Sequence, residues 1–240
     1  MKVLVGTLFA GEGDFDRCCN SVRDQSVPCE QFVIKGLRET EAHKQLYATF
    51  KASDADFFLK LDADMVLKNK HAVETMVREC SHKTMCVTAM VDDYFAGEPI
   101  YGMHLYTPLM EWNFEQFGSD TSRPDQLDSL SKIPRADRIR QHLVSILDVP
   151  LALHCHYATD FQSFHYGYHR SFKNERHICD KVISRNKRNP RDSKLRLAAM
   201  GILAAKAQPL LAACSYGKEL KKIFEHYKSL DKGGRFVHHG

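Results

Sequence analysis

Two aspartates, Asp62 and Asp64, are the residues whose type and spacing indicate chemistry most directly. They follow the apolar run FFLKL (residues 57–61), which has the composition of a buried strand. Ligand sites gather at the carboxyl ends of strands in open parallel sheets, and side chains two residues apart on an extended chain share a side. Two neighbouring carboxylates repel unless a cation compensates them, and Mg²⁺ or Mn²⁺ favours carboxylate oxygens. The pair predicts a divalent-metal site; the alternative is a solvated turn.

The segments around the aspartates must form the elements that position them. Hydrophobic periodicity predicts strands at residues 2–8, 31–35, 57–61 and 85–91, separated by helices that begin near Asp14, at residue 39 and at a cap on Asn69. This alternation is typical of βαβ units with a parallel sheet. Further strands are expected at residues 100–106 and 149–156, and helices after Thr159. We therefore predict an α/β core over residues 1–160 and a helical, basic extension over residues 161–240.

Composition and cysteine spacing narrow the class of protein. The 240 residues are 43% hydrophobic and 27% charged, which is ordinary for a globular protein with a core. The eight cysteines include no C-x-x-C pair, so neither a disulfide framework nor a zinc ribbon is indicated. No signal-peptide pattern and no membrane-spanning run stand out, and we expect a cytoplasmic protein with reduced thiols.

Positive charge is concentrated in one part of the chain. Residues 168–196 contain ten Lys or Arg and three Asp or Glu, a local excess of +7 in a chain whose net charge is +4. This asymmetry predicts an anionic partner at one place. The partner could be the phosphates of a nucleotide, or an anionic membrane surface with which the protein makes peripheral contact. No nucleic acid is expected.

Two phrases resemble the nucleotide-sugar glycosyltransferases of the GT-A fold, especially the family-2-like bacterial enzymes of surface-polysaccharide synthesis. The opening VLVGTLFAGEGDFDRCCNSVRDQ is similar to the family's first strand and helix, and LKLDADMVL resembles its D-x-D strand end. The resemblance covers roughly residues 1–175. It implies a mostly parallel GT-A sheet flanked by helices, and transfer of a sugar from a nucleotide-sugar donor to a glycan or lipid-linked acceptor. Residues 35–39 lack the acidic cluster that reads the nucleobase in the family, so the base is not predicted.

The resemblance also implies ligands for the donor and for a Mn²⁺ or Mg²⁺ cofactor. The donor-binding residues would be Thr7, Glu12, Asp62 and Gly102. The metal ligands would be Asp62 and Asp64 with a late histidine, for which His154 and His156 both qualify. These two histidines share one face of the expected strand, with Cys155 on the other.

A catalytic base is expected on the acceptor side. The acid of the family best matches Asp125, which follows Pro124 at the start of an expected helix, with Asp128 about one turn later. Such a carboxylate would deprotonate the acceptor hydroxyl in an inverting, direct displacement. Helix capping by Asp125 is the structural alternative.

Three other functions are compatible with parts of this sequence. A haloacid-dehalogenase-like phosphohydrolase would use Asp62 as nucleophile and Asp64 as acid/base. That motif usually opens its domain, whereas two βα units precede it here, and the usual glycine after it is absent. His165 and His169, one turn apart, fit a polar helix face better than a zinc site. A non-catalytic anion-binding module would leave the aspartate pair unused.

Overall fold

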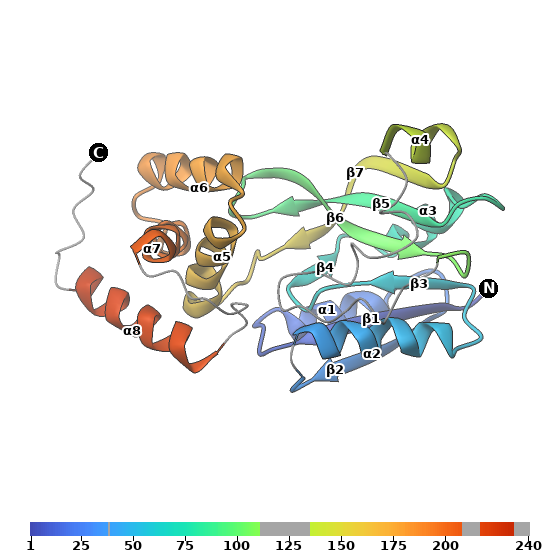
Figure 1. Cartoon of the computed structure of the whole chain (residues 1–240), viewed down its shortest axis with the longest axis horizontal. Helices are drawn as coiled ribbons and strands as arrows, with labels where there is room; N and C mark the ends of the chain where they lie inside the picture. Colours follow the sequence, from blue (N-terminus) through green and yellow to red (C-terminus); the bar gives the residue numbers. More distant parts are fainter. Residues whose placement is uncertain (38, 111–134, 208–216, 233–240) are drawn as a thin grey trace. The chain divides into compact units, whose positions relative to one another are not determined.

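The computed structural model describes residues 1–37, 39–110, 135–207 and 217–232 (Figure 1). The strands are β1 (Val3–Phe9), β2 (Cys29–Lys35), β3 (Phe57–Lys60), β4 (Met65–Leu67), β5 (Cys86–Asp93), β6 (Glu98–Tyr106) and β7 (Val144–His154). The helices are α1 (Phe15–Arg23), α2 (Glu39–Lys51), α3 (Ala72–Arg78), α4 (Arg135–Arg140), α5 (Asp160–Phe172), α6 (Arg176–Arg188), α7 (Ser193–Ala207) and α8 (Lys218–Lys232). The chain divides into unit 1, Met1–Tyr94 with Glu98–His156, and unit 2, Phe95–Gly97 with Tyr157–Gly240.

Unit 1 is built on a single seven-stranded sheet with the order β2-β1-β3-β6-β5-β7-β4. The pairs β1–β2, β1–β3 and β5–β7 are parallel, and the pairs β3–β6, β5–β6 and β4–β7 are antiparallel. Five strands therefore run in one direction, and only β6 and β4 run against them. The predicted α/β fold, with a mostly parallel sheet flanked by helices and a helical C-terminal extension, is confirmed.

Alternation along the inner strands supplies both layers of the core. Val3 and Val5 of β1 join one cluster with Cys18 and Val22 of α1, while Leu4 joins a second cluster with Leu46 of α2. Successive side chains of a strand point to opposite faces, so a nearly continuous apolar run indicates a sheet covered on both faces. Helices accordingly lie on both sides of the sheet (Figure 1).

Several element ends differ from the sequence prediction. The third helix begins after His71 and not after Asn69, whose side chain instead accepts a hydrogen bond from the backbone N–H of His71 at 2.8 Å. Strand β4 is only three residues long and was not predicted, because a segment so short has no readable period. Strand β7 begins at Val144, five residues before the predicted start at residue 149, because its pairing with β5 extends it.

Unit 2 consists of helices α5 to α8 with the short segment Phe95–Gly97. Thr159 and Gln162 form a reciprocal capping box at the start of α5. Helices α5 and α7 approach closely: a Cβ on Gly167 would lie 1.9 Å from the Ala198 carbonyl oxygen, and one on Gly201 would lie 2.0 Å from that of Phe164. No helix within the described ranges is long and apolar enough to cross a membrane.

Candidate metal centre

The register of β4 and β7 brings Asp64 to His154, although the two residues are far apart in sequence. Strand β3 ends at Lys60, and the chain turns through Asp62 to Asp64 before β4 begins at Met65. Met65 pairs with His154 at the last residue of β7, and the Cys155 backbone N–H donates to the Asp64 carbonyl at 3.0 Å. Backbone pairing therefore fixes this juxtaposition.

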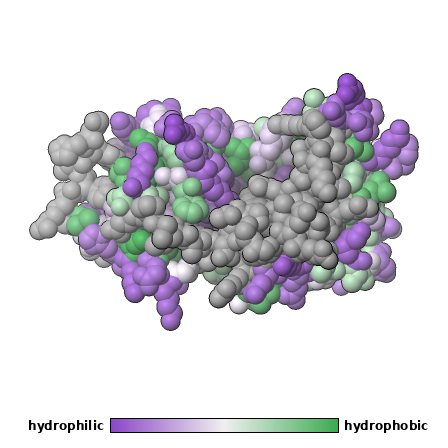
Figure 2. Space-filling view, in the orientation of Figure 1, coloured by the Kyte–Doolittle hydropathy of each residue, from purple (hydrophilic) through white to green (hydrophobic). Residues whose placement is uncertain are grey.

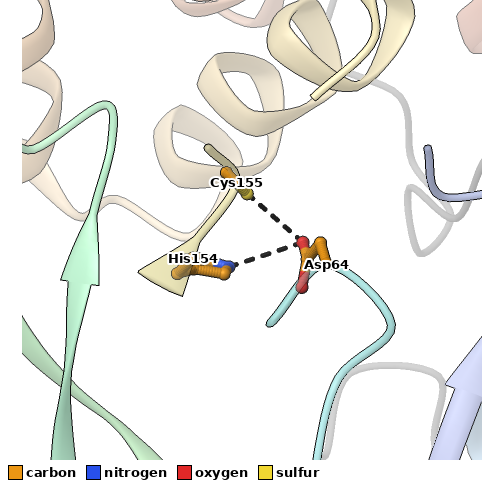
Figure 3. Close-up of side chains that lie close together, drawn as sticks. All are labelled: Asp64, His154 and Cys155. Atoms are coloured by element: carbon orange, nitrogen blue, oxygen red, sulfur yellow. Dashed lines mark hydrogen bonds and ion pairs between the residues drawn. The ribbon is translucent and has the colours of Figure 1, made fainter. Parts of the chain in front are cut away.

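Three side chains converge at this point (Figure 3). Oδ2 of Asp64 lies 3.4 Å from Nε2 of His154 and accepts a hydrogen bond from Sγ of Cys155 at 3.3 Å. Taken together, one ligand atom from each of the three residues lies within 4.8 Å of the others. The second oxygen of Asp64, Oδ1, is buried and has no hydrogen-bond partner among the described residues. A buried carboxylate oxygen without a donor is costly, and a cation would satisfy it.

A second carboxylate orients His154. Nδ1 of His154 lies 2.8 Å from Oδ2 of Asp93, whose side chain is fully buried. Asp93 and His154 are register partners at the ends of β5 and β7. A histidine that ligates a metal usually donates its other N–H to such a carboxylate, which fixes the tautomer and aims the free nitrogen at the ion.

The acidic groups around His154 favour the charged form of its imidazole. Burial opposes a charge on the imidazole, but the neighbouring acidic groups, Cys155 first and then Asp64 and Asp93, outweigh burial and raise the pKa of His154 well above its ordinary value. Burial likewise opposes ionisation of Asp64, yet His154 holds the pKa of that carboxyl below its usual range. An unprotonated Nε2 would place its lone pair against a carboxylate oxygen, so this nitrogen must carry a proton or a metal ion. The cluster fits a divalent cation.

Asp62 occupies a different environment from Asp64. Its Oδ1 accepts a hydrogen bond from Nζ of Lys60 at 3.0 Å, and the Lys60 side chain is only 5% exposed whereas that of Asp62 is 39% exposed. The thiol of Cys18 donates to the Asp62 carbonyl at 3.8 Å. Asp62 is thus an accessible carboxylate held by a buried ammonium, at the rim of the cluster.

The three other residues expected at the donor are dispersed around this edge. Glu12 accepts a hydrogen bond from the Ala10 N–H at 2.7 Å; burial raises its pKa, and Asp64 and Asp62 add to that rise, so its carboxyl lies within electrostatic reach of both. Thr7 is fully buried and its hydroxyl accepts from Gln31 at 2.9 Å. Gly102 lies at the irregularity where β6 bulges against β5, and a Cβ there would meet Val91 at 3.2 Å.

The expected relation between the two histidines and Cys155 is corrected by the structure. Alternation along an extended strand would put Cys155 opposite His154, but β7 ends at His154 and Cys155 has a φ of 60°. This left-handed turn places the Cys155 thiol beside His154, on the side of Asp64 (Figure 3). Nε2 of His156 instead lies 3.2 Å from the Asp92 carbonyl.

Sequence reasoning missed three members of this site: Asp93, Cys155 and Lys60. The acidic pair that ends β5 was a readable signal for Asp93, because β5 has the pattern of a core strand. Nothing in the sequence marks the turn at Cys155. The two residues expected to supply the base, Asp125 and Asp128, lie outside the described residues.

Comparisons with known proteins give distant likenesses in fold. No family model matches the chain, and no curated protein matches it either. Among solved structures, a mannosyltransferase from Pyrobaculum calidifontis, in complex with GDP-Man and Mn²⁺, has a TM-score of 0.47 at 12% identity and covers 99% of this chain and 88% of its own.

Two further structures are similar to a comparable or lesser degree. TarS of S. aureus (residues 1–349) has a TM-score of 0.45 at 10% identity over 95% of this chain and 79% of its own. A cytidylyltransferase from Leptospira borgpetersenii has a TM-score of 0.36 at 10% identity over 78% of this chain and 94% of its own. Likeness at this level does not establish a shared function, which must be derived from the residues of the site.

Proposed function

We propose that this chain is a nucleotide-sugar-dependent glycosyltransferase in which Asp64 and His154 hold a divalent metal ion beside the donor diphosphate. The observation that carries the proposal is the row of contacts Asp64–His154–Asp93. Asp93 and His154 lie at the carboxyl ends of β5 and β7, and Asp64 belongs to the aspartate pair that follows β3. Open α/β sheets bind their ligands outside these strand ends.

The metal ion and the residues around it would have distinct roles in the transfer. When bound, the ion neutralises the charge that develops on the leaving diphosphate. Asp93 holds the His154 ring so that Nε2 faces Asp64. Lys60 fixes one oxygen of Asp62 and leaves this half-exposed side chain at the rim, where the resemblance places the donor. Mn²⁺ and Mg²⁺ are the ions that the resemblance implies.

Transfer also needs a base on the acceptor side. We propose Asp125 for this role, and Asp128 as the alternative. The reaction would be an inverting displacement by a hydroxyl of a glycan or lipid-linked acceptor. Both carboxylates lie outside the described residues, so this assignment remains a prediction from the sequence.

The phosphohydrolase alternative gains nothing from the described geometry. It requires Asp62 as nucleophile on the first strand of its domain, whereas β1 and β2 precede β3 here. Oδ1 of Asp62 also accepts a hydrogen bond from Lys60, and Asp64 faces a histidine and a thiol. Trapping of an aspartyl phosphate would nevertheless favour it over transfer.

The basic part of unit 2 supports a second, finer proposal. Figure 2 shows hydrophilic side chains gathered over α6, and the exposed basic residues of this region are Arg176, Lys187, Arg188 and Arg191. A lipid-linked acceptor would bring the enzyme to a membrane surface, and each Lys or Arg near anionic lipid contributes about 1 kcal/mol. We propose peripheral contact of this surface with anionic membrane.

A screen of UDP-, GDP- and CMP-sugars tests the proposed function. We expect one class to raise the melting temperature in the presence of Mn²⁺ and to release its nucleoside phosphate on turnover. Asp64→Asn should lower turnover by about 100-fold or more, since it removes a metal ligand. Asp54→Asn is the matched control, because this exposed carboxylate precedes the amino end of β3 and binds Lys2 at 2.7 Å. Full activity of Asp64→Asn in excess chelator would contradict the proposal.

A further inference from the structure

Cys155 has a left-handed backbone conformation, which is unusual for a residue other than glycine. Its φ of 60° lies in the left-handed region, which a residue with a Cβ adopts at an energetic cost. An ordinary extended residue would continue β7 and turn the thiol to the opposite face from His154. The observed turn instead directs Sγ to the oxygen of Asp64 that faces His154, at 3.3 Å. Local backbone strain is thus used to place a thiol in the cluster.

Two of the three separations between the donor atoms have the size expected around a metal ion, and all three lie within 4.8 Å. Bond lengths of about 2.0 Å to oxygen or nitrogen and 2.3 Å to sulfur give ligand–ligand edges of about 3.3–3.5 Å around a tetrahedral ion. The observed separations of 3.4 Å between Asp64 and His154 and 3.3 Å between Cys155 and Asp64 have this size. Three protein ligands would leave a fourth position open, as in zinc sites that bind a substrate.

The chemistry of this donor set differs from that of a magnesium site. Mg²⁺ demands six oxygens in near-ideal octahedral geometry, whereas thiolate and imidazole favour Zn²⁺, Co²⁺ and similar ions. Cys155 is 4% exposed and His154 is 8% exposed, so few waters could complete an octahedron on their side. Burial raises the pKa of the Cys155 thiol, which therefore keeps its proton in the metal-free protein and donates a hydrogen bond to Asp64.

We infer that Cys155 is a third ligand of the metal proposed above, so that the site binds Zn²⁺ and Co²⁺ in preference to Mg²⁺. On binding, the bond from sulfur to the ion replaces the S–H bond, and the proton passes to solvent without any change of oxidation state. The inference rests on the proposed metal site at Asp64 and His154, but not on which sugar or acceptor the enzyme uses.

Titration of the metal-free full chain with Co²⁺ tests this inference by absorbance. We expect a thiolate-to-cobalt charge-transfer band to grow to one equivalent together with the visible bands of a tetrahedral ion, and Zn²⁺ to bleach both. Mg²⁺ in excess should bleach neither. In Cys155→Ser the charge-transfer band should vanish, and Co²⁺ affinity should fall by about tenfold or more. The matched control, Cys80→Ser, removes a half-buried thiol that donates to Met76 and should leave the spectrum unchanged.

Protection from alkylation provides a readout that does not need the variant to fold. Because Cys155 is only 4% exposed, iodoacetamide reaches its side chain through transient opening of the site. Peptide mapping after prolonged treatment should show Cys155 modified more slowly with Zn²⁺ than without, while Cys80 reacts equally in both. Tetrahedral bands without a charge-transfer band would overturn the role of Cys155 and leave the proposed metal site standing. The absence of any Co²⁺ spectrum would overturn both. Displacement of Co²⁺ by stoichiometric Mg²⁺ would overturn the preference for softer ions.

Discussion

At the scale of single residues, the candidate metal site is built around an imidazole between two carboxylates. His154 contacts Asp64 through one nitrogen and the buried Asp93 through the other. Because its folded pKa is raised above the unfolded value, protonated His154 stabilises the metal-free protein below the unfolded pKa of about 6.5, and this contribution is lost as the pH rises through the folded pKa. A metal on Nε2 would substitute for that proton.

The role of Asp93 in orienting His154 can be tested by substitution. Asp93→Asn keeps the size of the side chain but removes the charge that helps to raise the pKa of His154. We expect that pKa, followed by NMR titration of the metal-free protein, to fall. Metal affinity should fall by about 10- to 100-fold, as for other outer-shell partners of metal-bound histidines.

The control for that variant is Asp92→Asn on the same strand, where the carboxylate binds Lys68 at 2.6 Å instead of a histidine. An unchanged His154 titration and unchanged metal affinity in Asp93→Asn would show that Asp93 does not position the ring. A fall in metal affinity in Asp92→Asn of the same size would show that the effect is general to acidic charge near this edge.

At the scale of elements, two contacts decide the geometry: strand register in unit 1 and helix contact in unit 2. In unit 1 the three-residue strand β4 pairs with the end of β7, which places Asp64 beside His154. In unit 2, Gly167 and Gly201 let the backbones of α5 and α7 touch. Small residues of this kind permit an approach that any side chain would block.

Substitution of Gly167 tests the contact between α5 and α7, because the contact decides whether an added Cβ raises or lowers the free energy of unfolding. In an exposed helix Gly→Ala stabilises by about 1 kcal/mol, but here the new Cβ would lie 1.9 Å from the Ala198 carbonyl oxygen, a backbone atom that cannot rotate away. We expect Gly167→Ala to lower the free energy of unfolding by about 3 kcal/mol, the upper part of the usual range for overpacking. Denaturant unfolding measures this, with Ser171→Ala on the same helix as control. A stabilised Gly167→Ala variant would show that α5 and α7 are not in this contact.

At the scale of the whole molecule, acidic and basic groups are concentrated in different units. The aspartates of the site belong to unit 1, whereas the excess of +7 over residues 168–196 belongs to unit 2. A field concentrated on one unit attracts an anionic surface more strongly than the net charge of +4 suggests.

Sedimentation with anionic liposomes tests the proposed membrane contact. We expect binding at low salt that high salt abolishes, because the attraction decays within a Debye length of about 10 Å at 0.1 M salt. Glu substitutions at four exposed basic positions of unit 2 should abolish it: Arg176, Lys187, Arg188 and Arg191. The matched control reverses four exposed basic residues of unit 1: Arg23, Lys70, Arg78 and Lys83. Equal loss in both sets would point to net charge alone, and no salt-sensitive binding would exclude the membrane contact.

The local features of this protein can be predicted from its sequence. Apolar runs separated by helical periodicity predicted the α/β sheet, and the aspartate pair was readable because it directly follows the buried residues of β3. His154 was recognisable as one of two histidines at a strand end. Each of these predictions concerns residues that are close together in the sequence, so the spacing of apolar side chains is enough to make it.

Which of these groups come into contact depends on tertiary pairing and cannot be predicted from the sequence. Asp64 and His154 are joined by pairing between β4 and β7, and no local pattern encodes the register between strands so distant in sequence. Asp93 faces His154 through the pairing of β5 with β7. The left-handed turn at Cys155 reverses the side on which its thiol lies, because one residue with positive φ breaks the two-residue alternation from which its orientation had been inferred.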